Sequence, residues 1–71
     1  MDYRLLFARV GRACRRYREN VLHTPVSTVA QTLGYGVGAV YQFEQGRNHN
    51  YTFLLWYLSQ GMPVYLLFEE A

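Results

Sequence analysis

The sequence is poor in the residues that build disulfide, metal and membrane-spanning structures. Its single cysteine, Cys14, rules out an internal disulfide, and Cys14, His23 and His49 lack the spacing of a structural zinc site. No apolar run reaches the roughly 18–20 residues of a membrane span. The N-terminus mixes arginines with apolar residues, unlike a signal peptide. We therefore expect residues 1–71 to form one small domain, an intracellular binding module with no cofactor, no metal and no membrane partner.

Charge is also scarce, and it is unevenly distributed. Charged residues make up 17% of the chain, the formal net charge is +2, and there is no lysine. A net charge this small does not by itself indicate nucleic acid. Six of the seven arginines nevertheless lie in the first eighteen residues: Arg4, Arg9, Arg12, Arg15, Arg16 and Arg18.

The apolar residues recur with the period of a helix rather than a strand, so an all-α fold is expected. From Tyr3 to Val21 six of them fall within an arc of about 100°, and the six arginines lie on the opposite half of the predicted helix, together with the apolar residue Leu5. This arginine face has two interpretations: it is a solvated surface, or it contacts phosphate or an acidic protein. The apolar arc contains Leu6, Val10, Ala13, Cys14, Tyr17 and Val21.

Two short helices are expected next, over residues 24 or 25 to 33 and 37 to 45. Thr24 before Pro25 is the pattern of a helix N-cap followed by proline in the first turn. Gly34 occupies the position where a helix commonly ends with positive φ. Two helices joined by a short glycine-containing turn indicate a helix-turn-helix over about residues 25–45.

The C-terminal element, about residues 52–68, carries more apolar surface than a small monomer can cover. A helix over residues 52–60 is apolar all round, and an apolar tail follows Pro63. We therefore predict a homodimer, with an interface that contains Trp56, Tyr57, Tyr65, Leu66 and Phe68.

The order and spacing of these segments resemble the Cro/C1-type (lambda-repressor-like) helix-turn-helix family. The resemblance covers about residues 11–68 and is strongest from Val26 to Arg47. It implies a compact four- or five-helix domain and a transcriptional regulator that binds double-stranded DNA as a dimer. The matching positions are Gly11, Cys14, Arg15, Arg18, Val29-Ala30, Leu33-Gly34, Val40, Phe43-Glu44, Gly46-Arg47 and the stretch 61–68.

The resemblance also assigns roles to individual residues. Residues 37–45 would be the recognition helix, with base contacts in the major groove from Val37, Gly38, Tyr41 and Gln42. Phosphate contacts would come from Tyr35, Arg47, Asn48 and Asn50. Glu44 would be structural and paired with Arg15 or Arg18.

Some positions depart from the family pattern. Family members carry polar or basic residues where this chain has residues 36–39, and glutamine where it has Val26. This departure supports an alternative function, a protein-interaction module on a degenerate helix-turn-helix scaffold, such as an antirepressor or a partner of a repressor, a polymerase or a viral assembly. No catalytic motif is present, so an enzyme is not expected. By analogy the chain is a phage or mobile-element regulator, acting in the cytoplasm of a bacterial cell or of the bacterial host of a phage.

Overall fold

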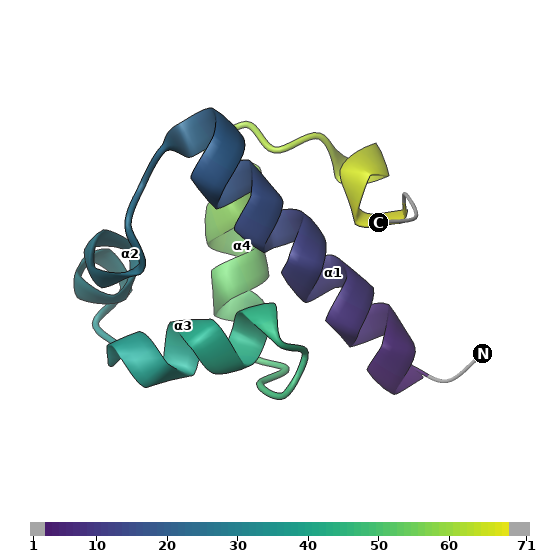
Figure 1. Cartoon of the computed structure of the whole chain (residues 1–71), viewed down its shortest axis with the longest axis horizontal. Helices are drawn as coiled ribbons and strands as arrows, with labels where there is room; N and C mark the ends of the chain where they lie inside the picture. The colour runs from purple at the N-terminus through teal and green to yellow at the C-terminus, as the bar shows by residue number, and fades with distance from the viewer. Residues whose placement is uncertain (1–2, 69–71) are drawn as a thin grey trace.

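The computed structural model describes residues 3–68, without the side chain of Phe68. Over these residues the structure is helical and contains no strand, which confirms the prediction of an all-α fold. The elements, shown in Figure 1, are α1 (Tyr3–Tyr17), the π-helical turn η1 (Arg18–Leu22), α2 (Val26–Leu33), α3 (Val37–Glu44), α4 (Tyr51–Ser59) and the 3₁₀ turn η2 (Val64–Phe68).

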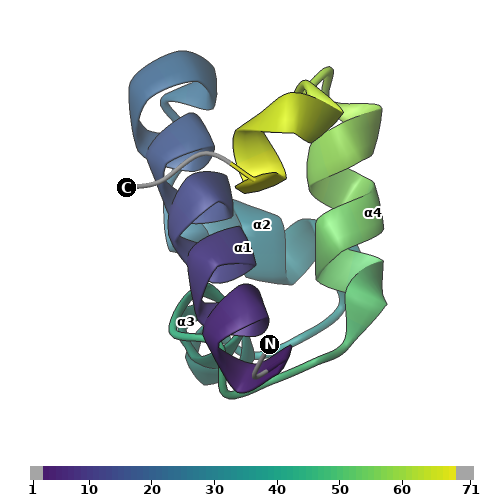
Figure 2. The same cartoon turned by 90° about the vertical axis from the view of Figure 1, so that its right-hand side faces the viewer.

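The longest helix, α1, separates two parts of the structure. In Figure 1, α2 and α3 lie on one side of α1 and η2 lies on the other. Figure 2 shows that α4 runs alongside α1 and that η2 returns from the end of α4 towards α1, against which it packs. The α2–α3 unit and the α1–η2 contact are therefore on different sides of the molecule.

All four α-helices contribute side chains to one core. The most deeply buried side chains include the stacked pair Phe43 and Tyr57, whose ring centroids are 6.3 Å apart. Phe53 lies 5.3 Å from Phe43 and continues the aromatic group. Cys14, Val29 and Val40 complete the set of fully buried side chains. Burial raises the pKa of the Cys14 thiol to about 12, and the negative charge of Glu44 adds to this shift.

The first helix does not continue regularly to Val21 as predicted. It changes into the π turn η1, and His23 ends that turn in the left-handed region with φ of 50°. A π turn takes more residues than an α turn, so the residues after Tyr17 rotate relative to the α-helical pattern. As a result Val21, expected in the core stripe, is 57% exposed. Arg18, expected on the arginine face, is buried at the start of the turn, where it pairs with Glu44.

The N-cap role predicted for Thr24 was also wrong. Pro25 is the N-cap residue of α2, with φ −69° and ψ 154°, and no side chain caps this helix. The Thr24 hydroxyl instead donates to the Leu22 carbonyl over 3.0 Å. Asn50 does cap its helix, because its side chain accepts from the Thr52 N–H, and α4 consequently begins at Tyr51.

Candidate nucleic-acid interface

The α2–turn–α3 unit forms the helix-turn-helix candidate. Helix α2 ends at Gly34, which has φ of 78°, and the Tyr35 N–H donates to the Ala30 carbonyl over 2.9 Å. Gly36 is extended, so α3 starts at Val37 after a short turn. Helices α2 and α3 pack against each other. This geometry fits a helix-turn-helix, and it places α3 with one side on the core and the other side at the surface.

The four residues predicted to contact bases are on the surface side of α3. Val37, Gly38, Tyr41 and Gln42 are exposed, whereas Val40, Phe43 and Glu44 of the same helix are buried. The inner positions follow the i, i+3 and i+4 spacing of a core-facing helix. The outer side is therefore the part of α3 that a ligand can reach.

Glu44, at the C-terminal end of α3, is held in a buried network. Arg18 donates to both of its carboxylate oxygens, from Nε over 2.8 Å and from Nη2 over 3.1 Å. The Tyr57 hydroxyl donates to Glu44 Oε2 over 2.8 Å, and Arg18 Nη1 donates to the Thr24 carbonyl over 3.1 Å. The hydrogen bond to Glu44 raises the pKa of Arg18, and burial raises the pKa of Tyr57.

This network decides between the two arginines considered as partners of Glu44. The partner is Arg18, and its interaction is bidentate and shielded from water. Arg15 instead pairs with the exposed Glu19, one helical turn further on, over 3.3 Å. The π turn begins at Arg18 and lies directly beside this ion pair.

The network also excludes Tyr57 from the predicted dimer interface. Tyr57 is fully buried, because α4 turns Phe53 and Tyr57, four residues apart, towards the core. Of the other interface candidates, Trp56 and Leu66 are half-buried and Tyr65 is exposed. The side chain of Phe68 lies outside the described residues.

The predicted phosphate contacts are divided by the structure into two groups. Arg47 is exposed just after α3, where its N–H donates to the Gln42 carbonyl over 2.8 Å. Asn50 instead donates from Nδ2 to the Tyr35 hydroxyl over 2.8 Å. Asn48 Oδ1 accepts from the Asn50 N–H over 3.0 Å. The two asparagine oxygens therefore serve the loop and the start of α4, and the Arg47 side chain remains the cation at this surface.

Sequence reasoning missed how this loop is attached to α1. His49 stacks on Phe7 with ring centroids 4.0 Å apart, and its Nε2 is 3.0 Å from the Gly46 carbonyl oxygen. Gly46 has φ of 80°, and a Cβ there would lie 2.7 Å from the backbone of Ala8. No spacing rule links Phe7 to His49, because the contact depends on the tertiary fold.

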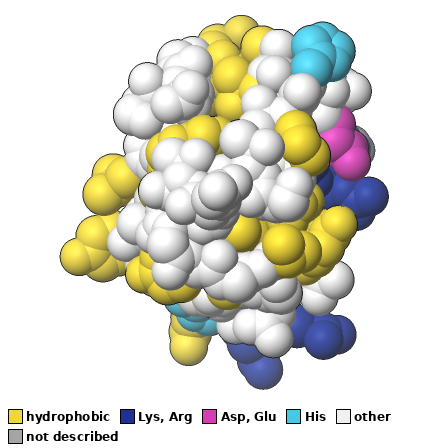
Figure 3. Space-filling view, turned by 90° about the vertical axis from the view of Figure 1, so that its left-hand side faces the viewer, with side chains coloured by type: hydrophobic (Ala, Val, Ile, Leu, Met, Phe, Trp, Pro, Cys, Tyr) yellow, Lys and Arg dark blue, Asp and Glu magenta, His cyan; other side chains and the backbone are white. Residues whose placement is uncertain are grey.

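The surface over α2 and the adjoining end of α3 carries almost no charge. Between residues 20 and 68 the only Asp, Glu, Lys or Arg residues are Glu44 and Arg47, and Glu44 is buried. Figure 3 shows uncharged and hydrophobic side chains over the middle of this face, with charged side chains, both dark blue (basic) and magenta (acidic), near its edges. The α2–α3 unit therefore presents no carboxylate that would repel a polyanion.

Within residues 3–68 no group of His, Cys, Asp and Glu side chains is placed to hold a metal ion. None of the helices in that part of the chain is both long and apolar enough to cross a bilayer. Comparisons with known protein families, curated protein sequences and solved structures gave no match.

Proposed function

We propose that this protein is a small DNA-binding transcriptional regulator, of phage or mobile-element type, that acts in the bacterial cytoplasm. In this proposal α3 enters the major groove, in the manner of the lambda-repressor-like helix-turn-helix. The observation that supports the proposal best is the α2–α3 unit itself, whose exposed surface has no carboxylate because Glu44 is paired inside the fold with Arg18.

The exposed residues of α3 suggest how bases would be contacted. Gln42 supplies an amide that can pair with adenine, Tyr41 supplies a hydroxyl, and Val37 can contact a thymine methyl group. Arg47 would bind phosphate beyond the C-terminal end of the helix. Few polar groups are available on α3, so sequence-dependent DNA shape would contribute to specificity.

Selection of duplexes from a random pool, followed by anisotropy titration over a range of salt concentrations, tests the proposal. We expect a preferred duplex, and an affinity that falls with salt at nearly one logarithmic unit per phosphate neutralised, about 0.9 for B-DNA. The absence of duplex binding at low salt would falsify the proposal.

Two matched substitutions locate the interface. Arg47→Ala is expected to weaken binding to all duplexes alike and to reduce the salt slope by about 1, whereas Gln42→Ala should reduce discrimination between duplexes. Arg15→Ala is the control for charge, because Arg15 is exposed but lies on α1 and pairs with Glu19. Equal losses for Arg47→Ala and Arg15→Ala would contradict an interface built on α3.

We further propose that the protein binds DNA as a homodimer through its C-terminal apolar surface. Tyr57 is not available, but Leu55, Val64 and Tyr65 are exposed on α4 and η2. Sedimentation equilibrium should give a dimer at micromolar concentration, and Tyr65→Ser should shift it towards monomer. A wild-type monomer at the concentration that saturates the duplex would contradict this part of the proposal.

A protein-interaction module on the same scaffold is the second candidate function. It is favoured by the outer side of α3, where Val37 is 41% and Tyr41 48% exposed in surroundings without charge. Exposed tyrosine and aliphatic side chains are typical of protein interfaces. Stoichiometric capture of a protein partner that is lost in Tyr41→Ala, together with no duplex affinity, would select this function.

A further inference from the structure

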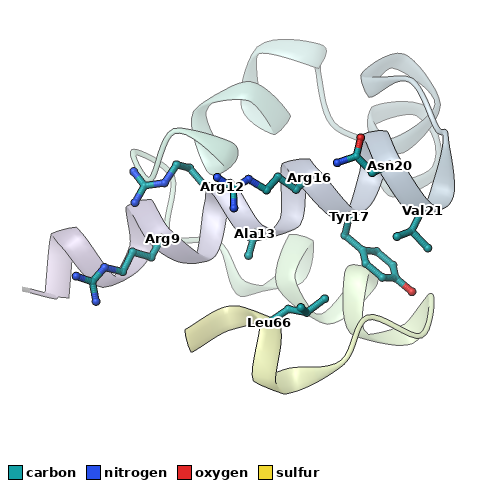
Figure 4. Close-up of a pocket in the computed structure, with 8 residues that line it drawn as sticks. All are labelled: Arg9, Arg12, Ala13, Arg16, Tyr17, Asn20, Val21 and Leu66. Atoms are coloured by element: carbon teal, nitrogen blue, oxygen red, sulfur yellow. The ribbon is translucent and has the colours of Figure 1, made fainter. Parts of the chain in front are cut away.

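A second surface feature lies away from the α2–α3 unit, between α1 and the C-terminal tail. It is a half-open pocket of about 180 Å³. Figure 4 shows that its residues come from α1 and η1, except for Leu66, which η2 places opposite them. The pocket is lined by Arg9, Arg12, Ala13, Arg16, Tyr17, Asn20, Val21 and Leu66.

The pocket combines an apolar floor with a cationic edge. Ala13, Tyr17 and Leu66 are half-buried and pack against the core. Arg12 and Arg16 are exposed one helical turn apart, and in Figure 4 the arginine side chains follow one edge while Tyr17 and Leu66 lie on the other. An occupant should therefore offer both apolar surface and negative charge.

Arg12 and Arg16 of this edge have no acidic partner within residues 3–68. No carboxylate there forms an ion pair with Arg12 or Arg16, whereas Arg15 and Arg18 on the same stretch of chain both have glutamate partners. Two like charges at positions i and i+4 of a helix repel each other and destabilise it. An acidic group bound at the edge would remove this repulsion.

The volume limits the size of the apolar part of the occupant. A cavity of about 150 Å³ admits a benzene molecule, whereas pockets for drug-sized ligands measure roughly 300–1,000 Å³. A pocket of about 180 Å³ therefore accepts one apolar side chain and is too small to enclose a larger ligand.

We propose that this pocket docks an acidic segment of a partner protein. One leucine, phenylalanine or tryptophan of that segment would occupy the pocket, and flanking Asp or Glu residues would pair with Arg12 and Arg16. Duplex DNA fits less well, because its backbone offers phosphate but no apolar anchor. The pocket and the α2–α3 unit lie on different sides of α1, so this docking is independent of DNA binding.

Defined peptides test the proposal with the full-length chain. The probe is a short fluorescein-labelled peptide with one central phenylalanine between glutamates; one control replaces the phenylalanine by alanine and another replaces the glutamates by glutamine. By fluorescence anisotropy we expect the probe to bind, and each control peptide to bind at least tenfold more weakly. The affinity of the probe should fall as the salt concentration rises, because exposed ion pairs are screened by salt.

Matched variants of the protein place the binding at the pocket. The double variant Arg12→Gln, Arg16→Gln should bind the probe roughly tenfold more weakly than the wild type. Arg15→Gln should lower the affinity by less than about twofold, because the exposed Arg15 is outside the pocket. Val21→Trp should block the pocket. Leu5→Trp is its control, since Leu5 is 61% exposed on α1 and does not line the pocket. Circular dichroism checks that each variant folds.

Several outcomes would overturn the proposal. Equal binding of the phenylalanine and alanine peptides would show that the peptide is held by charge attraction alone and that its phenylalanine does not occupy the pocket. Loss of duplex binding in the Arg12 and Arg16 variant, without probe binding to the wild type, would assign the edge to DNA. A dimer broken by Val21→Trp but not by Leu5→Trp would make the occupant a second copy. Probe binding only after Glu69→Gln and Glu70→Gln, which lie outside the described residues, would assign the pocket to the chain's own C-terminus.

Discussion

The two ends of α3 are constrained very differently. At its C-terminal end Glu44 is buried against Arg18 and Tyr57, and a Cβ on Gly11 of α1 would lie only 2.5 Å from the Glu44 carbonyl oxygen. At its N-terminal end a Cβ added at Gly36 or Gly38 would meet no atom within 4 Å. The fold therefore dictates the residues at one end of the helix, and it leaves the other end free to be selected by whatever the protein binds.

Removal of the buried carboxylate should have the largest effect. Glu44→Ala leaves Arg18 buried without its partner, and we expect a loss of about 3–5 kcal/mol in the free energy of unfolding, measured by urea denaturation. Glu19→Ala is the matched control, because Glu19 is an exposed carboxylate beside Arg15, and its loss should stay below about 1 kcal/mol. Similar losses in the two variants would show that the buried Glu44 pair contributes no more to stability than the exposed Glu19 pair.

The crossing of α1 over α3 should be the next most sensitive point. Gly11→Ala places a methyl group against the backbone of Phe43 and Glu44, which a side-chain rotation cannot relieve. We expect a destabilisation of about 1–3 kcal/mol, as for other overpacked sites. A melting temperature equal to that of the wild type would show that α1 and α3 can separate at no cost.

The buried groups near Glu44 should also make the fold sensitive to alkaline pH. The Cys14 thiol has an ordinary pKa of 9.0 and a pKa of about 12 in the fold, and the pKa of Tyr57 is also raised. Above pH 9 the unfolded chain therefore binds fewer protons than the folded chain, so stability is complete below that pH and declines above it. At pH 10 the thiol contributes a loss of about 1 kcal/mol.

Thermal unfolding at pH 7, 9, 10 and 11 measures this decline. Cys14→Ala should flatten the part of the profile that begins near pH 9, and wild-type Cys14 should react slowly with a thiol reagent because it is buried. A profile that is the same in both proteins would assign the alkaline sensitivity to other groups.

A substitution at the N-terminal end of α3 should instead increase the free energy of unfolding. Gly38→Ala adds a methyl group in open space and improves helix propensity, so we expect a stabilisation of about 1 kcal/mol in urea denaturation. If Gly38→Ala is destabilising, the added methyl group must contact other atoms at this end of the helix. Weaker duplex binding by a stabilised Gly38→Ala protein would sharpen the comparison, because a close approach of DNA backbone or base at Gly38 would then be the reason for glycine.

The sequence predicted those features of the fold that depend on local spacing. The core sides of α2 and α3 and the turn at Gly34 follow from helical periodicity and from the turn residue, whereas the structural role of Glu44 was implied by the family resemblance. The choice of Arg18 over Arg15 did not follow from either, because the two lie less than one helical turn apart and the position of α3 against α1 decides between them. Tyr57 was misassigned since α4 is apolar on all sides, so periodicity could not identify its buried face.

The candidate sites divide in the same way. The exposed residues of α3 could be placed from the spacing of the buried ones. The pocket could not, because it requires Leu66 of η2 to lie across from Arg12 and Arg16, some fifty positions away in the chain. The hydrogen bond between Tyr35 and Asn50 likewise depends on how α4 is positioned against the turn.

The π turn at residues 18–22 has a consequence for how this domain tolerates changes in length. A π turn holds one residue more than the α turn it replaces, and here the surplus lies over exposed residues 19–21, after the tightly packed α1 and before the buried α2 contacts. The extra residue is accommodated after Arg18, so the pairing of Arg18 with Glu44 does not depend on it. Removal of one of residues 19–21 should therefore be tolerated better than removal of a residue within α1, because the turn can close as a regular helix end without moving the ion pair.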